Sequence, residues 1–305
     1  QRNGIRLALT SDGQSVTELA RAPEILPVAR VLSAEPRVSP ELFESYAANF
    51  RYDPADLNAT VEEVDESASS RRELITLDSA DGRPMSLYLY LPTGHSGPYQ
   101  AVLFLPGLDA WAMSSIDDFG FHVDFLVRNG RAVVMPVYPG MFEGNMFFPL
   151  TGASSAVRQS ITHIHQDSRR ALDYLLERDE IDSDALALYG HSMGAQLAWS
   201  VLALEDRLKA AVLTVGGIAP THQFLEAVDP MRFVDRVTLP VLMLNSEFDP
   251  TMPLETAARP VFDRLATPTE DKRMVTAPGG HFVPRDFLIR NTRDWLDEYL
   301  GAVPR

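Results

Sequence analysis

Residues 185–204 read ALALYGHSMGAQLAWSVLAL. The first five residues form a continuous apolar run, which is typical of a strand buried on both faces of a parallel sheet. Gly190-His191-Ser192-Met193-Gly194 follows directly, and an apolar helix is predicted from Ala195 to Leu204. A serine between glycines at a sharp turn from strand to helix is the pattern of a nucleophile elbow, where small neighbours relieve crowding around a strained serine. We therefore predict that Ser192 is a nucleophile; a plain glycine-rich turn is the alternative.

Strand signals recur along most of the chain. Two β-rich runs, residues 73–78 and 85–91, and six short apolar runs are predicted strands; the apolar runs are residues 101–105, 132–137, 185–189, 210–215, 241–244 and 273–276. The two β-rich runs are separated by Asp81-Gly82, a hairpin-type turn signal. Apolar residues at helical spacing lie between later strands, for example within 171–176, and again near the end within 288–299. A hairpin followed by alternating strands and helices predicts an α/β fold with a mostly parallel, doubly wound sheet flanked by helices.

The first 66 residues differ from the rest of the chain in their sequence pattern. Residues 1–66 show little sustained periodicity, contain recurrent prolines and end in the acidic cluster Glu62, Glu63, Asp65 and Glu66. A short helix is predicted from Pro40 to Ala48. We expect residues 1–66 to form an N-terminal arm that packs on the main domain without a core of its own. Residues 67–305 are predicted to form the catalytic domain.

Composition excludes several classes of function. The chain contains no cysteine, so disulfides, thiolate catalysis and cysteine-bound metal sites are ruled out. Its formal net charge of -15 disfavours binding to nucleic acid or to anionic lipid. No apolar stretch is long enough for membrane insertion and no signal-peptide core is visible, so we expect a soluble protein and favour the cytoplasm. Metalloprotease, P-loop and dinucleotide motifs are missing, so we expect no metal or other cofactor.

A serine nucleophile needs a base and an acid that orients the base, in the chain order Ser, Asp or Glu, His for this fold. Asp249 follows the predicted strand 241–244, and His281 follows the strand that ends near Thr276. Both positions lie on loops at the carboxyl ends of strands, where open α/β sheets bind ligands. Glu247 is the competing acid. We predict Ser192, His281 and Asp249 as the catalytic triad.

Acyl transfer also requires hydrogen-bond donors for the negative oxygen that develops on the substrate. The backbone N–H of Met193, which follows the nucleophile, is the first predicted donor of this oxyanion hole. The second is the backbone N–H of Leu108, in the turn after strand 101–105, where Gly107 permits a close backbone approach.

Several apolar and aromatic residues are candidates for a substrate pocket. The segment 139–150 is rich in methionine and phenylalanine but broken by glycine and proline, so it could form a lid or wall over an apolar pocket, or simply pack as a buried loop. The pocket candidates are Trp111, Met141, Phe142, Phe147, His222 and Met252. His163 and His165 are two residues apart and face different sides of a helix, which makes them a poor metal pair. His191 is expected to serve packing rather than chemistry.

These motifs resemble the α/β-hydrolase superfamily over about residues 72–305. The stretch 167–175, then Ile181-Asp182, then the elbow at 190–194, looks like the branch of acetyl xylan esterases, dienelactone hydrolases and prolyl oligopeptidase-like enzymes. A closer resemblance is to bacterial esterase-like domains that are often attached to serine/threonine protein kinases. It is carried by residues 38–43, 57–59, 136–138, 241–245, 253–256 and 294–296. The resemblance implies an α/β-hydrolase fold, the triad named above, and an N-terminal arm that belongs to the same unit.

The predicted function is hydrolysis of a small carboxylic ester through an acyl-enzyme on Ser192. The same groups could instead cleave amides, peptides, lactones or C–C bonds, and the fold could also serve as a non-catalytic ligand-binding module. A haloalkane dehalogenase is disfavoured because its elbow would carry an aspartate where Ser192 stands.

Overall fold

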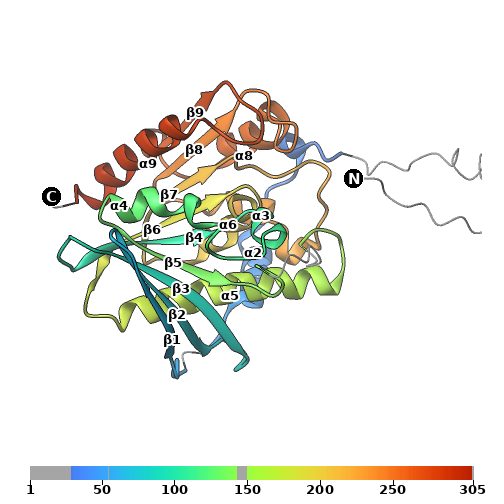
Figure 1. Ribbon diagram of the computed structural model, residues 1–305. Helices are drawn as coiled ribbons and strands as arrows, with labels where there is room; N and C mark the ends of the chain where they lie inside the picture. Colours follow the sequence, from blue (N-terminus) through green and yellow to red (C-terminus); the bar gives the residue numbers. More distant parts are fainter. Residues whose placement is uncertain (1–28, 54, 143–149, 304–305) are drawn as a thin grey trace, which may run out of the picture.

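The fold is built on one nine-stranded sheet, seen in a computed structural model that describes residues 29–53, 55–142 and 150–303 (Figure 1). The strands are β1 (Thr60–Glu66), β2 (Ser70–Asp78), β3 (Pro84–Pro92), β4 (Tyr99–Leu105), β5 (Ala132–Val137), β6 (Ile181–His191), β7 (Leu208–Thr214), β8 (Val241–Ser246) and β9 (Lys272–Ala277). The helices are α2 (Pro40–Ala47), α3 (Asp109–Ala112), α4 (Asp124–Arg128), α5 (Ser155–Leu176), α6 (Met193–Leu204), α7 (Met231–Val234), α8 (Arg259–Arg264) and α9 (Arg285–Leu300).

The strand order is β1-β2-β3-β5-β4-β6-β7-β8-β9. Strands β1, β2 and β3 pair antiparallel with one another, and β3 also pairs antiparallel with β5. From β5 to β9 every pairing is parallel. The chain therefore moves to one side of β4 to form β5 and to the other side to form β6. The carboxyl ends of β4 and β6 meet at this change of direction, which is where open α/β sheets bind ligands.

Helices cover both faces of the sheet, as predicted. In Figure 1, α4 and α9 lie in front of the strands and α5 lies behind them. Helix α6 packs against α5 as well as against β4, β6 and β7. Its residues 193–202 are all buried, which explains why α6 is apolar all round rather than amphipathic. All eight predicted strands are present, so the expected doubly wound α/β architecture is confirmed.

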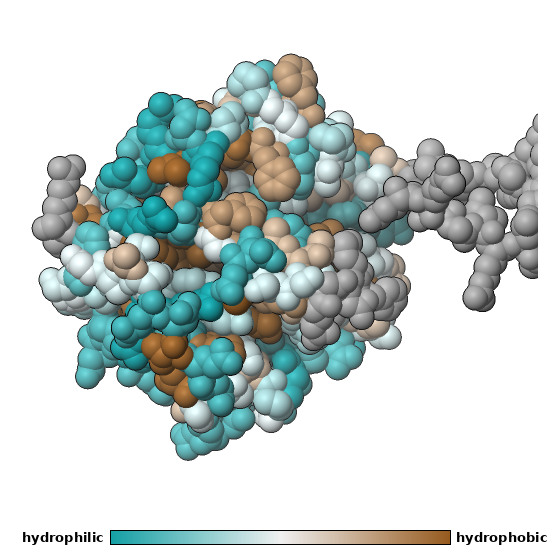
Figure 2. All heavy atoms as spheres, viewed as in Figure 1, coloured by the Kyte–Doolittle hydropathy of each residue, from teal (hydrophilic) through white to brown (hydrophobic). Residues whose placement is uncertain are grey.

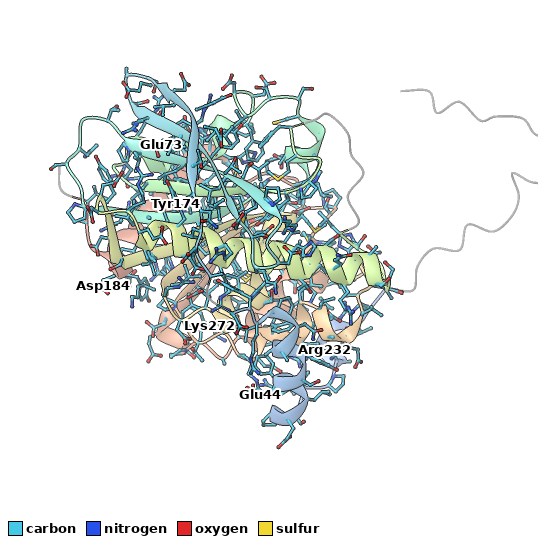
Figure 3. The ribbon with its side chains drawn as sticks, turned by 90° about the horizontal axis from the view of Figure 1, so that it is seen from below. Glu44, Glu73, Tyr174, Asp184, Arg232 and Lys272 are labelled. Atoms are coloured by element: carbon cyan, nitrogen blue, oxygen red, sulfur yellow. The ribbon has the colours of Figure 1, made fainter. Side chains whose placement is uncertain are left out.

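Helix α5 is joined to the antiparallel strands by a buried polar contact. Viewed from below, α5 crosses under the sheet, with Tyr174 on the helix and Glu73 on β2 (Figure 3). Arg178 donates to the Glu73 carboxylate at 2.8 Å and to the Tyr174 hydroxyl at 2.6 Å. The carboxylate of Glu73 is fully buried, so this arginine supplies the charge partner that burial requires.

Residues before the sheet pack on its helical layer. The predicted helix at Pro40 is present as α2, capped by the Ser39 side chain, with Pro40 at its first turn. Phe50 is fully buried, with its ring centroid 5.3 Å from that of Phe233 and 4.4 Å from that of His165. Contacts of this kind join the described residues before β1 to α5 and α7.

One strand differs from the prediction. The acidic cluster at residues 62–66 is predicted to end an N-terminal arm, whereas the structure places residues 60–66 in edge strand β1, paired with β2. All seven residues of β1 are exposed, so no apolar alternation marks the strand in the sequence. Acidic side chains on an exposed edge also discourage pairing with another chain.

Candidate active site

Ser192 occupies a strained turn between β6 and α6. Its backbone has φ +51° and ψ -113°, a region that non-glycine residues rarely adopt. The flanking glycines are required by close packing. A Cβ on Gly190 would lie 2.9 Å from the Ala195 Cα, and a Cβ on Gly194 would lie 2.0 Å from the Leu105 carbonyl oxygen. The sequence pattern at 190–194 therefore forms the tight strand-to-helix turn that it predicted.

Three side chains from separate loops form a hydrogen-bonded chain at this turn. Ser192 Oγ lies 2.6 Å from His281 Nε2. His281 Nδ1 lies 2.9 Å from Asp249 Oδ2 and 3.0 Å from Asp249 Oδ1. Asp249 follows β8 and His281 follows β9, so both come from the same edge of the sheet as Ser192. This arrangement has the geometry of a nucleophile, a general base and an acid that orients the base.

The environment keeps Asp249 ionised. Burial alone raises the pKa of this carboxyl, but hydrogen bonds from His281 and from the backbone amides of Met252 and Thr251 outweigh burial, and the pKa lies below its ordinary value. The competing acid, Glu247, is exposed to solvent. Asp249, rather than Glu247, is therefore the carboxylate beside the imidazole.

The loop after β4 contacts the same turn. A Cβ added to Gly107 would lie 3.2 Å from the Ser192 Cβ, which shows how closely this backbone approaches the serine. Leu108 follows and immediately precedes α3, while Met193 is the first residue of α6. The N–H groups at the start of a helix have no acceptor within that helix, so the Met193 amide is available to a ligand. The two predicted oxyanion-hole residues, Leu108 and Met193, thus lie on two segments of the chain that come together at Ser192.

The predicted pocket residues are distributed over several places. Trp111 is buried and its indole N–H donates to the Pro139 carbonyl at 2.9 Å. Met141 is buried and its sulfur accepts from the Tyr138 amide. Phe142 packs edge-on against Phe119. Phe147 lies outside the described residues.

The two remaining pocket candidates lie beyond the elbow helix. The His222 ring lies within 3.1 Å of the Gln196 side chain of α6, so it makes a polar contact with that helix. Met252 is buried in a small cluster with Ala219 and Ala257. Gln196 is itself fully buried and accepts from the Ala219 amide, which fixes the position of this group.

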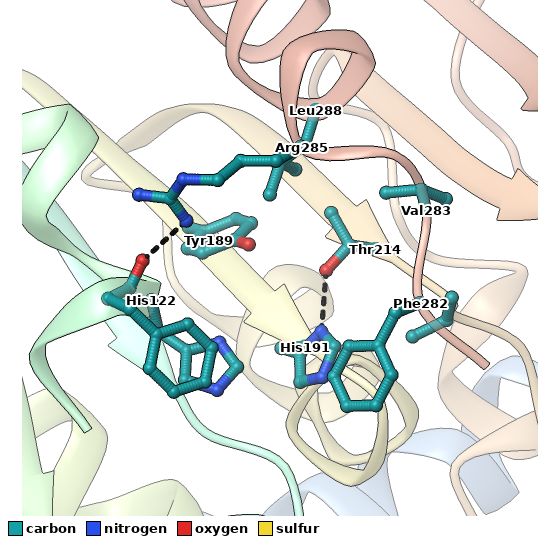
Figure 4. A pocket seen from close by; sticks show the side chains of 10 residues that line it. His122, Tyr189, His191, Thr214, Phe282, Val283, Arg285 and Leu288 are labelled. Atoms are coloured by element: carbon teal, nitrogen blue, oxygen red, sulfur yellow. Dashed lines mark hydrogen bonds between the residues drawn. The ribbon is translucent and has the colours of Figure 1, made fainter. Parts of the chain in front are cut away.

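A cavity of about 170 Å³ lies between the start of α9 and the carboxyl ends of β6 and β7 (Figure 4). Its walls are formed by Phe121, His122, Tyr189, His191, Thr214, Val215, Phe282, Val283, Arg285 and Leu288. His191 and Phe282 are the chain neighbours of Ser192 and His281, so the cavity adjoins the hydrogen-bonded chain. None of the five predicted pocket residues that the structure describes lines it. The positions of His191 next to Ser192 and of Phe282 next to His281 are the signals that could have indicated this cavity from sequence.

The face of the molecule drawn in space-filling form in Figure 2 is mixed in polarity. Figure 2 shows a mostly hydrophilic face on which hydrophobic side chains gather around hollows between segments. Phe282 is 58% exposed and its ring stacks on that of His191, with centroids 5.4 Å apart. An aromatic side chain therefore forms the outer wall of the cavity.

Three of the described residues have the composition of a metal site: Asp109, His122 and His191. One potential ligand atom from each lies within 4.8 Å of the others. Asp109 Oδ2, however, is only 2.6 Å from His122 Nε2, which is a hydrogen-bond distance. His191 Nδ1 lies 3.0 Å from the Thr214 hydroxyl, and burial lowers the pKa of His191 to about 3, so its ring is neutral. The neutral His191 ring thus lines the cavity, while its expected role in packing rather than chemistry stays a prediction.

The fold and the elbow together define an α/β protein with the architecture of a hydrolase. The family model described as "Alpha/beta hydrolase family" matches residues 102–302, which is more than half of the chain. The chain belongs to this family.

Comparisons with individual proteins agree with the family. The chain is 28% identical over 151 residues to a 2,6-dihydropseudooxynicotine hydrolase of Paenarthrobacter nicotinovorans, covering 50% of this chain and 36% of that protein. It is 27% identical over 170 residues to esterase FrsA of Yersinia pestis, covering 55% of this chain and 37% of that protein. The matched region thus spans little more than a third of the length of these relatives.

Among solved structures, an acetyl xylan esterase from Paenibacillus sp. R4 is similar, with a TM-score of 0.66. The alignment has 18% identity and covers 90% of this chain and all of that one. At this identity the likeness shows a shared fold. No helix in the described ranges combines the length and apolar character needed to cross a bilayer.

Proposed function

We propose that this protein is a carboxylic ester hydrolase that acts on small esters through an acyl-enzyme on Ser192. The observation that carries the proposal is the hydrogen-bonded chain from Ser192 through His281 to Asp249. It lies at the carboxyl edge of the sheet, beside an apolar cavity. The similarity to esterase FrsA, named above, supports an ester as the substrate over an amide or another acyl compound.

In the first half of the reaction, Ser192 Oγ attacks the ester carbonyl carbon while its proton passes to His281 Nε2. Asp249 accepts the His281 Nδ1–H and stabilises the imidazolium that forms. The carbonyl oxygen becomes negative and accepts hydrogen bonds from the backbone amides of Met193 and Leu108. The C–O bond to the alcohol then breaks, and His281 returns the proton to the departing alkoxide.

In the second half, water replaces the alcohol. His281 Nε2 takes a proton from this water as its oxygen attacks the acyl carbon. The tetrahedral intermediate forms at the same two backbone amides. Its collapse breaks the bond to Ser192 Oγ, the proton returns to the serine, and the carboxylic acid leaves.

The substrate is proposed to place an apolar group in the cavity beside His191 and Phe282. Phe121 and Leu288 give this cavity further hydrophobic wall, which suits a short alkyl or aryl group better than a charged one. The acidic net charge disfavours anionic substrates.

The test compares wild-type protein with Ser192→Ala on p-nitrophenyl esters of increasing chain length. We expect wild-type turnover and a loss of about 10⁴- to 10⁶-fold in kcat for the variant. A fluorophosphonate probe should label wild-type protein at Ser192 and leave the variant unlabelled. Equal turnover by the pure variant would reject the proposal, and a wild-type protein that neither turns over ester nor takes the label would indicate a binding module. An ester and an amide of one acyl group separate esterase from amidase activity.

A further inference from the structure

The carboxylate of Asp109 connects the loop after β4 to a separate part of the fold. Asp109 directly follows Leu108, and its Oδ2 lies 2.6 Å from His122 Nε2. The side chain of His122 is only 5% exposed and that of Asp109 is 23% exposed. The proposed triad does not use either residue, and the polar contact between them lies next to the amide proposed to bind the oxyanion.

His122 is itself held rigidly. It ends the short 3-10 helix Gly120–His122, and its ring centroid lies 4.4 Å from that of Phe119 and 4.0 Å from that of Phe121. The backbone of this segment is fixed from α9, because Arg285 donates to the Phe121 carbonyl at 2.9 Å and pairs with Asp124. Figure 4 shows the Arg285 guanidinium reaching across the cavity to this segment. A contact with His122 therefore ties Asp109 to the scaffold.

The other anchors of the loop that carries Asp109 lie further along the chain, where the Phe142 amide donates to the Ala110 carbonyl at 2.9 Å and the Trp111 indole donates to the Pro139 carbonyl at 2.9 Å. Helix α3 has only four residues, and Gly107 adds backbone freedom where the loop passes Ser192. The amides of Ala110 and Met113 bond to carbonyls within the same segment, Gly107 and Asp109, and so do not attach it to the sheet. The Asp109 side chain supplies a polar connection from this loop to a neighbouring segment.

We infer that Asp109 and His122 form a clamp that positions the Leu108 amide for oxyanion binding. They are positioning residues, since neither touches the reacting atoms, and the inference rests on the proposed function. A donor contributes most when its direction is set before the negative charge develops, because no reorganisation is then needed during the reaction. A loop freed from His122 would move the Leu108 N–H away from that direction.

The charge state of the pair fits a clamp. Burial alone raises the pKa of Asp109, but the contact with His122 outweighs it, and the pKa lies below its ordinary value. Asp109 is thus a carboxylate, and charge-assisted hydrogen bonds of this kind are roughly twice as strong as neutral ones. Asp109 Oδ1 is buried and has no hydrogen-bond partner among the described residues. His122 is therefore the main side-chain partner of this carboxylate.

The spacing favours a hydrogen bond over a metal ion. Two ligand atoms held about 2.0 Å from a tetrahedral zinc ion lie about 3.3 Å apart. Asp109 Oδ2 and His122 Nε2 are 2.6 Å apart, which leaves no room for an ion between them. The cluster of Asp109, His122 and His191 is therefore assigned to loop positioning.

The experiment replaces the donor while keeping the space filled. His122→Phe retains an aromatic ring within the surrounding aromatic side chains but removes the N–H, whereas His122→Gln retains an N–H at a similar reach. Asp109→Ala removes the acceptor. His163→Phe, at a histidine on α5 that pairs with Asp81, is the matched control. Each variant is assayed on one short aryl ester, and its affinity for an aliphatic trifluoromethyl ketone, which forms a tetrahedral adduct, is measured alongside its thermal midpoint.

For His122→Phe and Asp109→Ala we expect kcat to fall about 10- to 100-fold, less than for outright loss of an oxyanion donor, with KM changed less than about threefold. The affinity for the ketone should fall in parallel, and His122→Gln should recover most of the loss. A His122→Phe variant that folds and keeps kcat within twofold would overturn the inference. So would a loss confined to KM, no recovery in His122→Gln, or one equivalent of metal bound to the purified protein.

Failure of the clamp and failure of the proposed function are distinguishable. If wild-type protein shows no turnover that depends on Ser192, the function itself is wrong. If Ser192→Ala abolishes turnover but His122→Phe does not reduce it, only the clamp is wrong. If His122→Phe fails to fold, the comparison of Asp109→Ala with His122→Gln carries the test.

Discussion

Asp249 lies with both carboxylate oxygens within 3.0 Å of His281 Nδ1, although 32 residues separate the two in the chain. Glu247, two residues before Asp249, is exposed instead. The loop after β8 therefore turns one acid toward the imidazole and the other toward solvent.

This difference predicts opposite outcomes for two similar substitutions. Asp249→Asn should lower kcat about 10³- to 10⁴-fold, because the amide favours the wrong imidazole tautomer and no longer stabilises the imidazolium. Glu247→Gln should stay within about twofold of wild type. Both are measured by steady-state hydrolysis of one aryl ester. The opposite ranking would show that Glu247 is the orienting acid.

Gly194 should tolerate no side chain. A Cβ there would lie 2.0 Å from the Leu105 carbonyl oxygen, so either α6 or the end of β4 must shift in Gly194→Ala. We expect the free energy of unfolding to fall by about 2–3 kcal/mol or more, together with loss of activity. Gly120→Ala is the control, since nothing lies within 4 Å of a Cβ at that position. Urea unfolding of both variants checks the prediction, which fails if their midpoints agree.

The cavity should set the preferred size of the substrate. Leu288 lines the cavity from α9, so Leu288→Ala should enlarge it and shift the best substrate toward longer acyl or alcohol chains. Ile289→Ala is the matched control, because Ile289 packs against the core from the same helix but does not line the cavity. The readout is kcat/KM over a series of p-nitrophenyl esters. An unchanged chain-length profile in Leu288→Ala would place the substrate elsewhere.

Stability should depend on pH through two buried histidines. Burial lowers the pKa of His165 and of His191 to about 3, from an ordinary value near 6.5. Between these values the unfolded chain binds a proton at each ring that the folded protein does not. Stability is therefore fully present above about pH 6.5 and falls as the pH drops, by up to about 1.4 kcal/mol per pH unit for each histidine.

His165→Asn isolates one of these contributions, since asparagine can still bond to the Ser200 hydroxyl that His165 Nδ1 contacts. Between pH 6.5 and 4 we expect the unfolding free energy of this variant to fall less steeply with pH than that of wild type. The difference in slope should correspond to about one bound proton. Urea titrations at several pH values provide the measurement. Equal slopes for wild type and His165→Asn would contradict the assignment of a neutral buried ring.

Local signals in the chain were sufficient for the central turn and for most of the sheet. The six continuous apolar runs became strands β4 to β9, and the two β-rich runs on either side of Asp81-Gly82 became β2 and β3. The turn at 190–194 was recognisable because a strained serine needs small neighbours. The order of Ser192, Asp249 and His281 along the chain indicated which loops would meet. Strand β1 escaped because its exposed side chains carry no apolar period.

Contacts between distant segments depended on packing that no local pattern records. The pairing of Asp109 with His122 follows from the way the loop after β4 and the segment before α4 fold back on each other. The cavity exists because α9 returns over the ends of β6 and β7 and brings Leu288 and Arg285 next to His191. The composition of segment 139–150 favours a pocket wall, yet the described part of that segment, residues 139–142 and 150, does not line this cavity. Composition reports which side chains prefer burial, whereas their neighbours are set by the three-dimensional path of the whole chain.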